Sequence, residues 1–577
     1  MKPRQSFLYG TMILAMGTVI VKLVGALFKV PLANLLGGVG MSYFNVAYDL
    51  YYPLYALFVS GVPIAVSKLV SESLAQGRCR DARRLLRVAI CLFAGAGLLG
   101  SLVMYAGAGW FANLVNNPSA KYAVRCLSPA LFCGCLLAVF RGYSQGHQDM
   151  APTAISQMIE AVAKLVFGLT FTYSISWIGL HQYAQEGVVF GLACDSEQQA
   201  SLLVLPFAAA GAILGVTVST LCGAFYMALC HRPGRRISRE QWEAAPPAAS
   251  TGALMHRLVH LAVPVCIAAV ISNLTSFIDL ISVMNRLNKA IYQNPEIVLG
   301  MYQGAIPEGI GLEQLGSYLY GCYSGLTVPV YNLVPSLTTV IGVSLLPAVA
   351  AAWATHNRVQ LERNAASALR LAAMIAIPAG LGIAVMATPV LELLYFSKPM
   401  EIAAISPALH LMGLSAVFVA ISLPVNAILQ AVGQATVPMR LLFFGGLLKL
   451  ALNYMLVAIP QLNIHAAPVG TMACYTLVLL GGLWSLVHTT GLKLPFIPVF
   501  GKPLFAGICC ALTAHFSFGW LSKWLPSQVS TLVAIGCGGV VYVFLILITR
   551  TITKQDIFLL PQGEKFAQIL EKHSFLG

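Results

Sequence analysis

The sequence predicts an all-α, polytopic membrane protein with about 14 transmembrane helices. Three observations support this prediction: 58% of the 577 residues are hydrophobic, only 9% are charged, and the mean hydropathy is +0.80. Soluble domains usually carry about 25% charged residues, so the chain has too few charges to cover a water-soluble globule of this size. A soluble enzyme, a disordered protein and a coiled coil are therefore excluded.

Apolar stretches of about 20 residues recur along the whole chain, and each is long enough to cross roughly 30 Å of hydrocarbon as a helix. The predicted spans are 7–31, 43–66, 85–109, 123–144, 152–177, 201–230, 257–284, 318–351, 367–391, 403–430, 438–459, 467–489, 503–521 and 529–549. The first span contains Lys22 and Lys29 and lacks a small-residue cleavage site. We therefore expect it to be retained rather than removed as a signal peptide.

Lys and Arg residues segregate between the two sides on which the loops alternate. About 24 fall on the side of the N-terminus and 6 on the opposite side, which predicts a plasma-membrane protein with both termini in the cytoplasm. Most of the formal net charge of +14 is thus explained by the orientation of the chain in the membrane, and it does not indicate nucleic-acid binding. The other four cations, Lys22, Lys29, Lys164 and Lys449, fall inside apolar spans.

The chain divides into two predicted lobes. The basic connection 231–256 has the composition of a cytoplasmic linker, and it separates an N-terminal six-helix lobe, 1–230, from a C-terminal six-helix lobe, 257–489. Two extra transmembrane helices follow at 490–550, and a cytoplasmic tail at 551–577.

An internal repeat supports this division. The loop after the fourth span reads QGHQDMAP (145–152), with Lys164 twelve residues after the proline. The loop after the tenth span reads QAVGQATVP (430–438), with Lys449 eleven residues after the proline. Because both loops are predicted on the cytoplasmic side, the repeat is parallel, with a pseudo-two-fold axis along the membrane normal.

Charges inside the spans point to a binding site, because a charge at the bilayer centre costs roughly 2.5 to 3.5 kcal/mol and normally faces protein or water. Lys22, Gly25 and Lys29 are three and four residues apart and share one helix face, where an anion could dock. The alternative is that both lysines extend toward the membrane interface.

The second span carries a polar and aromatic stripe. Its members are Asn45, Asp49 and Tyr52 at helical spacing, with Tyr48, Tyr51 and Tyr55 close by. Such a stripe suits sugars, which need hydrogen-bond partners and flat faces. The alternative is an interfacial aromatic belt with an aspartate that pairs with a lysine.

In the fifth span Glu160 and Lys164 share a face. Glu before Lys at i, i+4 favours an intrahelical pair. The other interpretation places Lys164, about 18 Å along its helix, in a central cavity. In the second lobe the candidates are Asp279, together with Lys449 and Asn453 at i, i+4. The intramembrane charges sum to +1, which favours an anionic passenger.

Catalytic motifs are absent from the sequence: no HExxH, GxSxG or P-loop pattern occurs. We therefore expect a protein that is not an enzyme and has no cofactor or metal site, although an unidentified coupling ion is possible. The 14 Cys lie mostly in apolar runs and are interpreted as small core residues.

Five segments resemble the stage V sporulation protein B type of polysaccharide transporter. They are FLYGT (7–11), KLVG (22–25), PL (31–32), GVPIAVSKLV (61–70) and GYSQGHQDMAPT (142–153). That group belongs, with the lipid II flippases, to the multidrug/oligosaccharidyl-lipid/polysaccharide (MOP) exporter superfamily. The resemblance covers essentially the whole chain.

The resemblance implies a MATE-like bundle of 14 helices in two lobes around a cationic cavity. Such a bundle would flip an undecaprenyl-pyrophosphate-linked oligosaccharide across the bacterial cytoplasmic membrane by alternating access, for peptidoglycan, the cell wall, sporulation or another surface polysaccharide. Lys22 occupies the position of a first-helix arginine that contacts the diphosphate. The flippases carry another arginine in the eighth helix, where this chain has apolar 328–330, so the anion contacts would fall to Lys164 and Lys449.

The predicted cavity residues are Lys22, Lys29, Asn45, Asp49, Glu160, Lys164, Asp279, Lys449 and Asn453. The expected partners are the lipid-linked oligosaccharide and membrane lipids, with no nucleic acid, and the expected state is a monomer. The sequence leaves two alternative functions open. A cation-coupled multidrug exporter would need a carboxylate-lined cavity, and a membrane glycosyltransferase would need a large outer loop with paired acidic residues.

Overall fold

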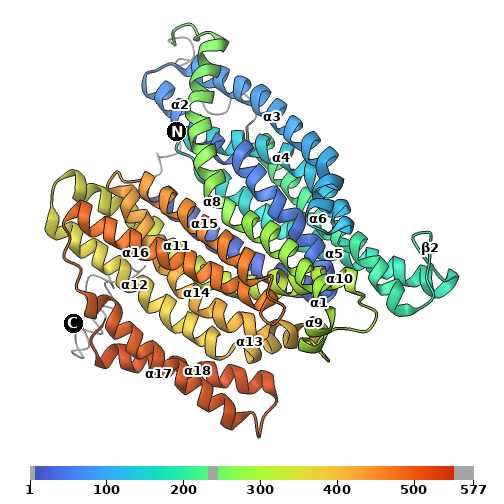
Figure 1. Ribbon diagram of the computed structural model, residues 1–577. Coiled ribbons are helices and arrows are strands. Elements are labelled where there is room, and N and C mark those ends of the chain that lie inside the picture. Colours follow the sequence, from blue (N-terminus) through green and yellow to red (C-terminus); the bar gives the residue numbers. More distant parts are fainter. Residues whose placement is uncertain (1–6, 232–244, 552–577) are drawn as a thin grey trace. The chain divides into compact units, whose positions relative to one another are not determined.

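The protein is almost entirely helical (Figure 1). The computed structural model describes residues 7–231 and 245–551, so half of the predicted linker and nearly all of the predicted tail lie outside the described residues. Within these residues the chain forms 17 α-helices and one small antiparallel β-hairpin, β1 (Val188–Val189) with β2 (Leu192–Ala193). Eleven of the helices are long and apolar enough to cross a membrane. The prediction of an all-α, multi-span membrane protein is confirmed.

These 11 helices account for 12 of the 14 predicted spans, because the first apolar helix, Ile20–Ala75, contains two of them. The other two predicted spans, 257–284 and 318–351, are also helical, but only Thr251–Ile267 qualifies there, as a shorter apolar helix. The total of 14 spans and their orientation in the membrane stay predictions.

The described chain forms two compact units. The first contains the residues up to Asn285 together with Glu308–Gly321, and the second contains Arg286–Pro307 and the residues from Cys322 onward. Most of α8 (Thr251–Gln293) therefore belongs to the first unit, although 257 is the predicted start of the second lobe. The predicted lobes are defined by the internal repeat, whereas the compact units are defined by packing. The division into lobes therefore stays a prediction.

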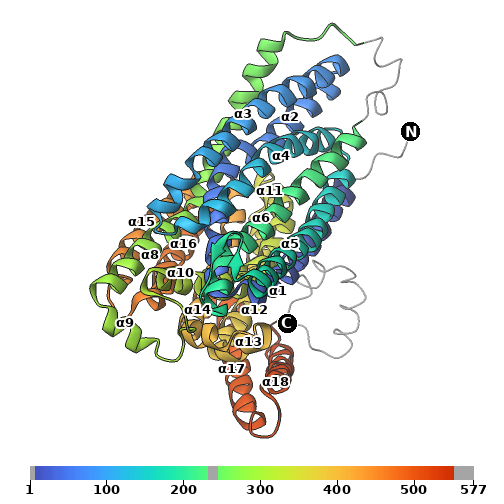
Figure 2. The same ribbon diagram turned by 90° about the vertical axis from the view of Figure 1, so that its right-hand side faces the viewer.

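The first unit is built around helices that lie side by side in Figures 1 and 2, with α4 beside α2 and α3, and with α5 beside α6. Its elements are α1 (Phe7–Tyr55), the π-helical turn η1 (Ala56–Ser60), α2 (Val62–Ala75), α3 (Cys79–Leu114), the 3-10 turn η2 (Pro118–Ala120), α4 (Lys121–Gly146), α5 (Ala151–Glu186), α6 (Glu197–Cys230), most of α8, and α10 (Leu312–Cys322) up to Gly321.

The second unit is also helical, and α14 packs against α11, α12 and α16 in its interior. Its other elements are α9 (Pro295–Met301), η3 (Tyr323–Thr327), α11 (Val328–Ala354), α12 (Arg358–Val385), α13 (Ala387–Leu394), α14 (Pro399–Ala431), α15 (Thr436–Leu456), η4 (Asn463–Ala466), α16 (Ala467–Thr490), η5 (Ile497–Gly501), α17 (Lys502–Leu521) and α18 (Ser527–Ile548). The last two helices form a hairpin that packs on α12 (Figure 2).

The element α1 is a helical hairpin rather than one straight helix. Gly37 has φ 62° and ψ −171°, a backbone conformation that glycine adopts without steric cost. The rings of Phe28 and Phe44 are 6.1 Å apart, whereas 16 residues of straight helix would separate them by about 24 Å. The arms 7–36 and 38–55 therefore run back along each other, and residues of the first and second predicted spans face one another.

Glycines on α4 bring that helix close to α2. A Cβ added at Gly142 would lie 2.9 Å from the Pro63 Cα and carbonyl oxygen, and one added at Gly146 would lie 2.6 Å from the Val70 Cβ. The Ser71 hydroxyl donates to the Gly146 carbonyl at 2.9 Å. This is the spacing of small residues that lets membrane helices approach closely.

Candidate functional site

A partly buried ion pair joins α4 and α5 in the first unit. Arg141 pairs with Glu160, and the Arg141 Nε donates to the Ser156 hydroxyl at 2.9 Å. The Arg141 and Glu160 side chains are only 12% and 23% exposed. Sequence reasoning counted Arg141 with the cytoplasmic cations and missed this pair. Its place inside the apolar span 123–144 is the signal that could have revealed it.

Lys164 follows Glu160 by one helical turn, yet the two do not form an ion pair. The Lys164 Nζ lies 5.0 Å from the ring centroids of both Phe28 and Tyr48. Within the described residues it makes no hydrogen bond or ion pair. Contacts with aromatic faces hold an ammonium group in place without neutralising it. Lys164 therefore keeps its positive charge available for an anion.

A second ammonium group lies near Lys164. Lys29, on the first arm of α1, is partly buried and close enough to Lys164 and Asp49 for their charges to interact. In the part of the chain that the structure describes, Lys29 has no hydrogen bond or ion pair. The hairpin at Gly37 explains why lysines of the first and fifth predicted spans share one region, because it presents Phe28 and Tyr48 together to Lys164.

The predicted tyrosine stripe is continuous on the second arm of α1. The ring centroids of Tyr48 and Tyr52 are 5.3 Å apart, and those of Tyr51 and Tyr55 are 5.4 Å apart. Tyr52 is 44% exposed, whereas Tyr48 and Tyr51 are buried. These rings extend from the Lys164 ammonium group along one arm of the hairpin.

The polar members of the stripe occupy different environments. Asp49 accepts a hydrogen bond of 2.8 Å from the Tyr320 hydroxyl, so α10 is tied to the second arm of α1. Asn45 is buried, at 6% exposure. Asp49 therefore has at least one structural partner in addition to its interaction with the Lys29 charge.

Lys22 lies apart from the two clustered lysines, toward the start of α1, with an exposed side chain. Gly25 leaves open space on the neighbouring turn, because no atom lies within 4 Å of a Cβ added there. The shared face of Lys22 and Gly25 is thus accessible in the first unit.

The candidates on α15 lie in the second unit. Lys449 is 3% exposed and Asn453 is fully buried, and both pack against α16 at Gly470, which has no side chain to fill the space. Arg286 of the same unit lies over the Tyr454 ring. Lys449 and Asn453 therefore share one face, as the spacing predicts, and that face is covered by α16.

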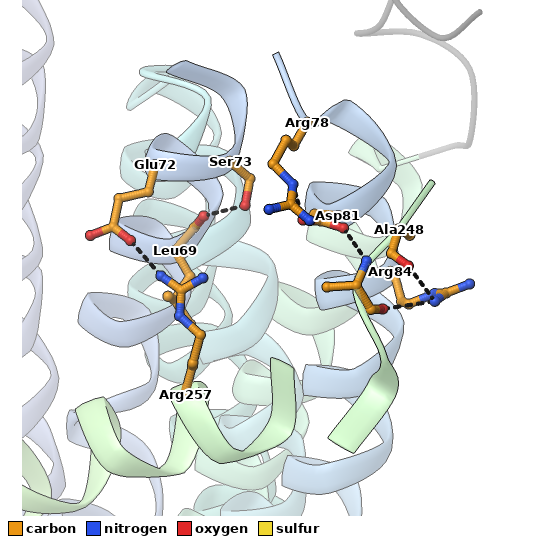
Figure 3. A network of polar contacts seen from close by, with 9 residues as sticks. Leu69, Glu72, Ser73, Arg78, Asp81, Arg84, Ala248 and Arg257 are labelled. Carbon is orange, nitrogen blue, oxygen red and sulfur yellow. Dashed lines mark hydrogen bonds and ion pairs between the residues drawn. The ribbon is translucent and has the colours of Figure 1, made fainter. Parts of the chain in front are cut away.

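Asp279 lies on α8, which is fastened to α2 and α3 along its length. Near its start Arg257 pairs with Glu72 at 2.9 Å (Figure 3). Further along, the Phe277 and Phe111 rings stack at 6.1 Å, and the Asn116 amide donates to Asn285 at 2.6 Å. The half-buried Asp279 is therefore held in the first unit, with the N-terminal helices.

The chain that leads into α8 is held as well (Figure 3). The buried Asp81 carboxylate accepts from the Ala249 backbone amide at 2.7 Å and pairs with Arg78 at 2.8 Å. Arg84 donates to the carbonyl oxygens of Ala248 and Ala249 at 3.1 Å and 2.7 Å. The start of α3, between the second and third predicted spans, thus binds residues 248–249 of the predicted linker.

Among the described residues, no group of three or more His, Cys, Asp or Glu side chains is placed to hold a metal ion. The 14 Cys are free thiols, and six of them are buried. Around Lys164 the first unit has a partly buried ion pair, two ammonium groups that make no salt bridge among the described residues, and a stripe of tyrosines.

Comparisons with known proteins place this fold in a family. The polysaccharide biosynthesis protein family matches residues 7–193, and the MatE family matches residues 324–455. The lipid II flippase MurJ of Bacillus subtilis (strain 168) is 24% identical over 477 residues, covering 79% of this chain and 78% of that protein. Stage V sporulation protein B of the same organism is 22% identical over 568 residues, covering 97% and 98%.

A solved structure shows the same fold. An inward-facing multidrug resistance MATE transporter of the MOP superfamily superposes with a TM-score of 0.60, at 14% identity, over 83% of this chain and 99% of that one. The chain matches transporter families in both units and has the fold of a MOP superfamily transporter. It is a multi-pass membrane transporter rather than an enzyme, and it is distantly related to the lipid II flippase and to stage V sporulation protein B.

Proposed function

We propose that this MOP transporter is a flippase for an undecaprenyl-pyrophosphate-linked oligosaccharide, which it moves from the cytoplasmic to the outer leaflet by alternating access. The observation that carries the proposal is the pair of ammonium groups, Lys29 and Lys164, which lie inside apolar helices and make no salt bridge among the described residues. Charges in such places are costly, so their retention calls for an anionic ligand.

The diphosphate fits these groups by charge. Lysine presents a compact cation on a flexible stem, and such a cation can follow a phosphate group as the protein changes conformation. The aromatic contacts of Lys164 supply about 0.5 to 2 kcal/mol of attraction without cancelling its charge. An incoming diphosphate would therefore meet a cation that is positioned but not neutralised.

The sugar fits the stripe beside the lysines. Tyr48, Tyr51, Tyr52 and Tyr55 supply flat faces and hydroxyl groups next to the Lys164 ammonium. Two relatives support the proposal, because one is named a lipid II flippase and the other a stage V sporulation protein. Lys22, Lys449 and Asn453 are proposed as further contacts of the head group at other stages of transport.

Reconstitution with a leaflet-specific readout tests the proposal. Purified protein in vesicles should flip polyprenyl-diphosphate-linked saccharides, and Lys164→Met and Lys29→Met should each lower the rate at least about tenfold, or roughly 1.4 kcal/mol. Lys523→Met, in the predicted loop between the last two spans, is the matched control and should leave the rate unchanged.

Cationic dyes provide the counter-test, because a multidrug exporter of the same superfamily would move them. If the vesicles transport such dyes and ignore every lipid-linked sugar offered, the flippase proposal is wrong. Wild-type flipping by Lys164→Met would likewise remove the observation on which the proposal rests.

A further inference from the structure

Arg141 stands out because nothing in the proposed function uses it, although it lies inside an apolar helix and forms the most buried ion pair near the lysines. Its partner Glu160 is one helical turn before Lys164 on α5. Glu and Lys in this order at i, i+4 attract each other, and the attraction grows where water is excluded. A Glu160 side chain without another cation would therefore be drawn to Lys164.

The structure shows Glu160 engaged elsewhere. Its carboxylate pairs with the Arg141 guanidinium, and the Arg141 Nε is held in turn by the Ser156 hydroxyl at 2.9 Å. Glu160 also packs against α6, since a Cβ added at Gly223 would lie 2.8 Å from the Glu160 Cγ. The carboxylate is thus fixed on the Arg141 side, and Lys164 is left over the rings of Phe28 and Tyr48.

We infer that Arg141 is a positioning residue of the transporter, which keeps Lys164 available to an anionic head group by occupying Glu160. The inference rests on the proposed function, because it assigns Arg141 a part in the same anion site. Arg141 itself does not contact the ligand. Its guanidinium satisfies the carboxylate that would otherwise neutralise the lysine.

The mechanism makes the effect of Arg141 depend on Glu160. With Glu160 present, loss of the guanidinium releases the carboxylate to Lys164, so anion binding weakens. With Glu160 replaced by glutamine, no carboxylate competes for the lysine, so loss of the guanidinium has little effect. A direct contact between Arg141 and the ligand would weaken binding equally in both backgrounds, and so would a purely structural role.

The test measures binding of undecaprenyl diphosphate, the carrier without sugar, to the full chain in phosphatidylcholine nanodiscs. We expect Arg141→Gln to weaken binding at least about tenfold, or roughly 1.4 kcal/mol. Arg141→Gln combined with Glu160→Gln should bind within about threefold of the wild type, and adding Lys164→Met to that pair should abolish the recovery. Arg141→Lys, which keeps a cation beside Glu160, should bind within about threefold of wild type.

Two outcomes separate this inference from the proposed function. If Lys164→Met binds the carrier as well as the wild type, Lys164 is not an anion site and the proposed function loses its support. If Lys164→Met binds weakly but the double glutamine variant is as weak as Arg141→Gln, the role of Arg141 is refuted while the proposed function stands. If Arg141→Gln fails to insert, binding is compared between Glu160→Gln and the double variant Arg141→Gln/Glu160→Gln. A tenfold difference in affinity between these two variants overturns the inference.

Discussion

Replacing Gly142 by alanine should separate α4 from α2. A Cβ at this position would lie 2.9 Å from the Pro63 Cα, the Pro63 carbonyl oxygen and the Val66 Cβ. Backbone atoms cannot rotate away as a flexible side chain can, so the two helices would have to move apart by roughly 0.5 to 1 Å. Over-packing of this kind costs about 1 to 3 kcal/mol.

Gly107→Ala, on α3, is the matched control because no atom lies within 4 Å of a Cβ added there. Both substitutions gain the same helix propensity, so the difference between them isolates the packing cost. The assay is reversible unfolding of the purified protein in detergent, with the melting temperature as a second readout. If Gly142→Ala were as stable as Gly107→Ala within about 0.5 kcal/mol, the close approach of α2 and α4 would be refuted.

Three further predictions concern the first unit. Lys22→Ala should abolish flipping with normal membrane insertion, and wild-type rates in vesicles would remove Lys22 from the mechanism. Glu72→Arg and Arg257→Glu should each weaken the attachment of α8, and the double exchange should recover it. Because these side chains are 39% and 57% exposed, we expect a coupling energy of about 0.2 to 1 kcal/mol in a double-mutant cycle of unfolding, and zero coupling would contradict the pair. Tyr320→Phe removes the 2.8 Å hydrogen bond to Asp49 and should lower stability by about 1.5 to 3 kcal/mol in the same assay, so an unchanged unfolding midpoint would show that the bond contributes nothing.

The helical membrane fold could be predicted from composition and apolar periodicity, because lipid requires long helices that satisfy their own backbone groups. Twelve of the predicted spans coincide with helices apolar enough to cross a membrane. The predicted spans 7–31 and 43–66 already require a reversal of the chain between them, but the sequence did not show that a single residue, Gly37, makes the turn.

The candidate site was predicted in part. The spacing of Glu160 and Lys164 placed them on one face, but sequence could not decide between an intrahelical pair and a free lysine. That decision depends on Arg141, which is 19 residues from Glu160 along the chain and reaches it only because α4 and α5 pack together. Likewise the contacts of Phe28 and Tyr48 with Lys164 depend on the hairpin at Gly37, which brings these two residues of α1 to the same place.

The position of α8 has a consequence for how the polypeptide is assembled. The first unit is composed of separate stretches of chain, because 248–285 contact α2, α3 and the turn after α3 through Glu72, Asp81, Arg84 and Asn116. During synthesis the N-terminal helices are therefore incomplete until α8 emerges and covers them. If the chain were cut within 232–244, the two fragments would still bind each other. The second fragment would carry α8, which completes the first unit.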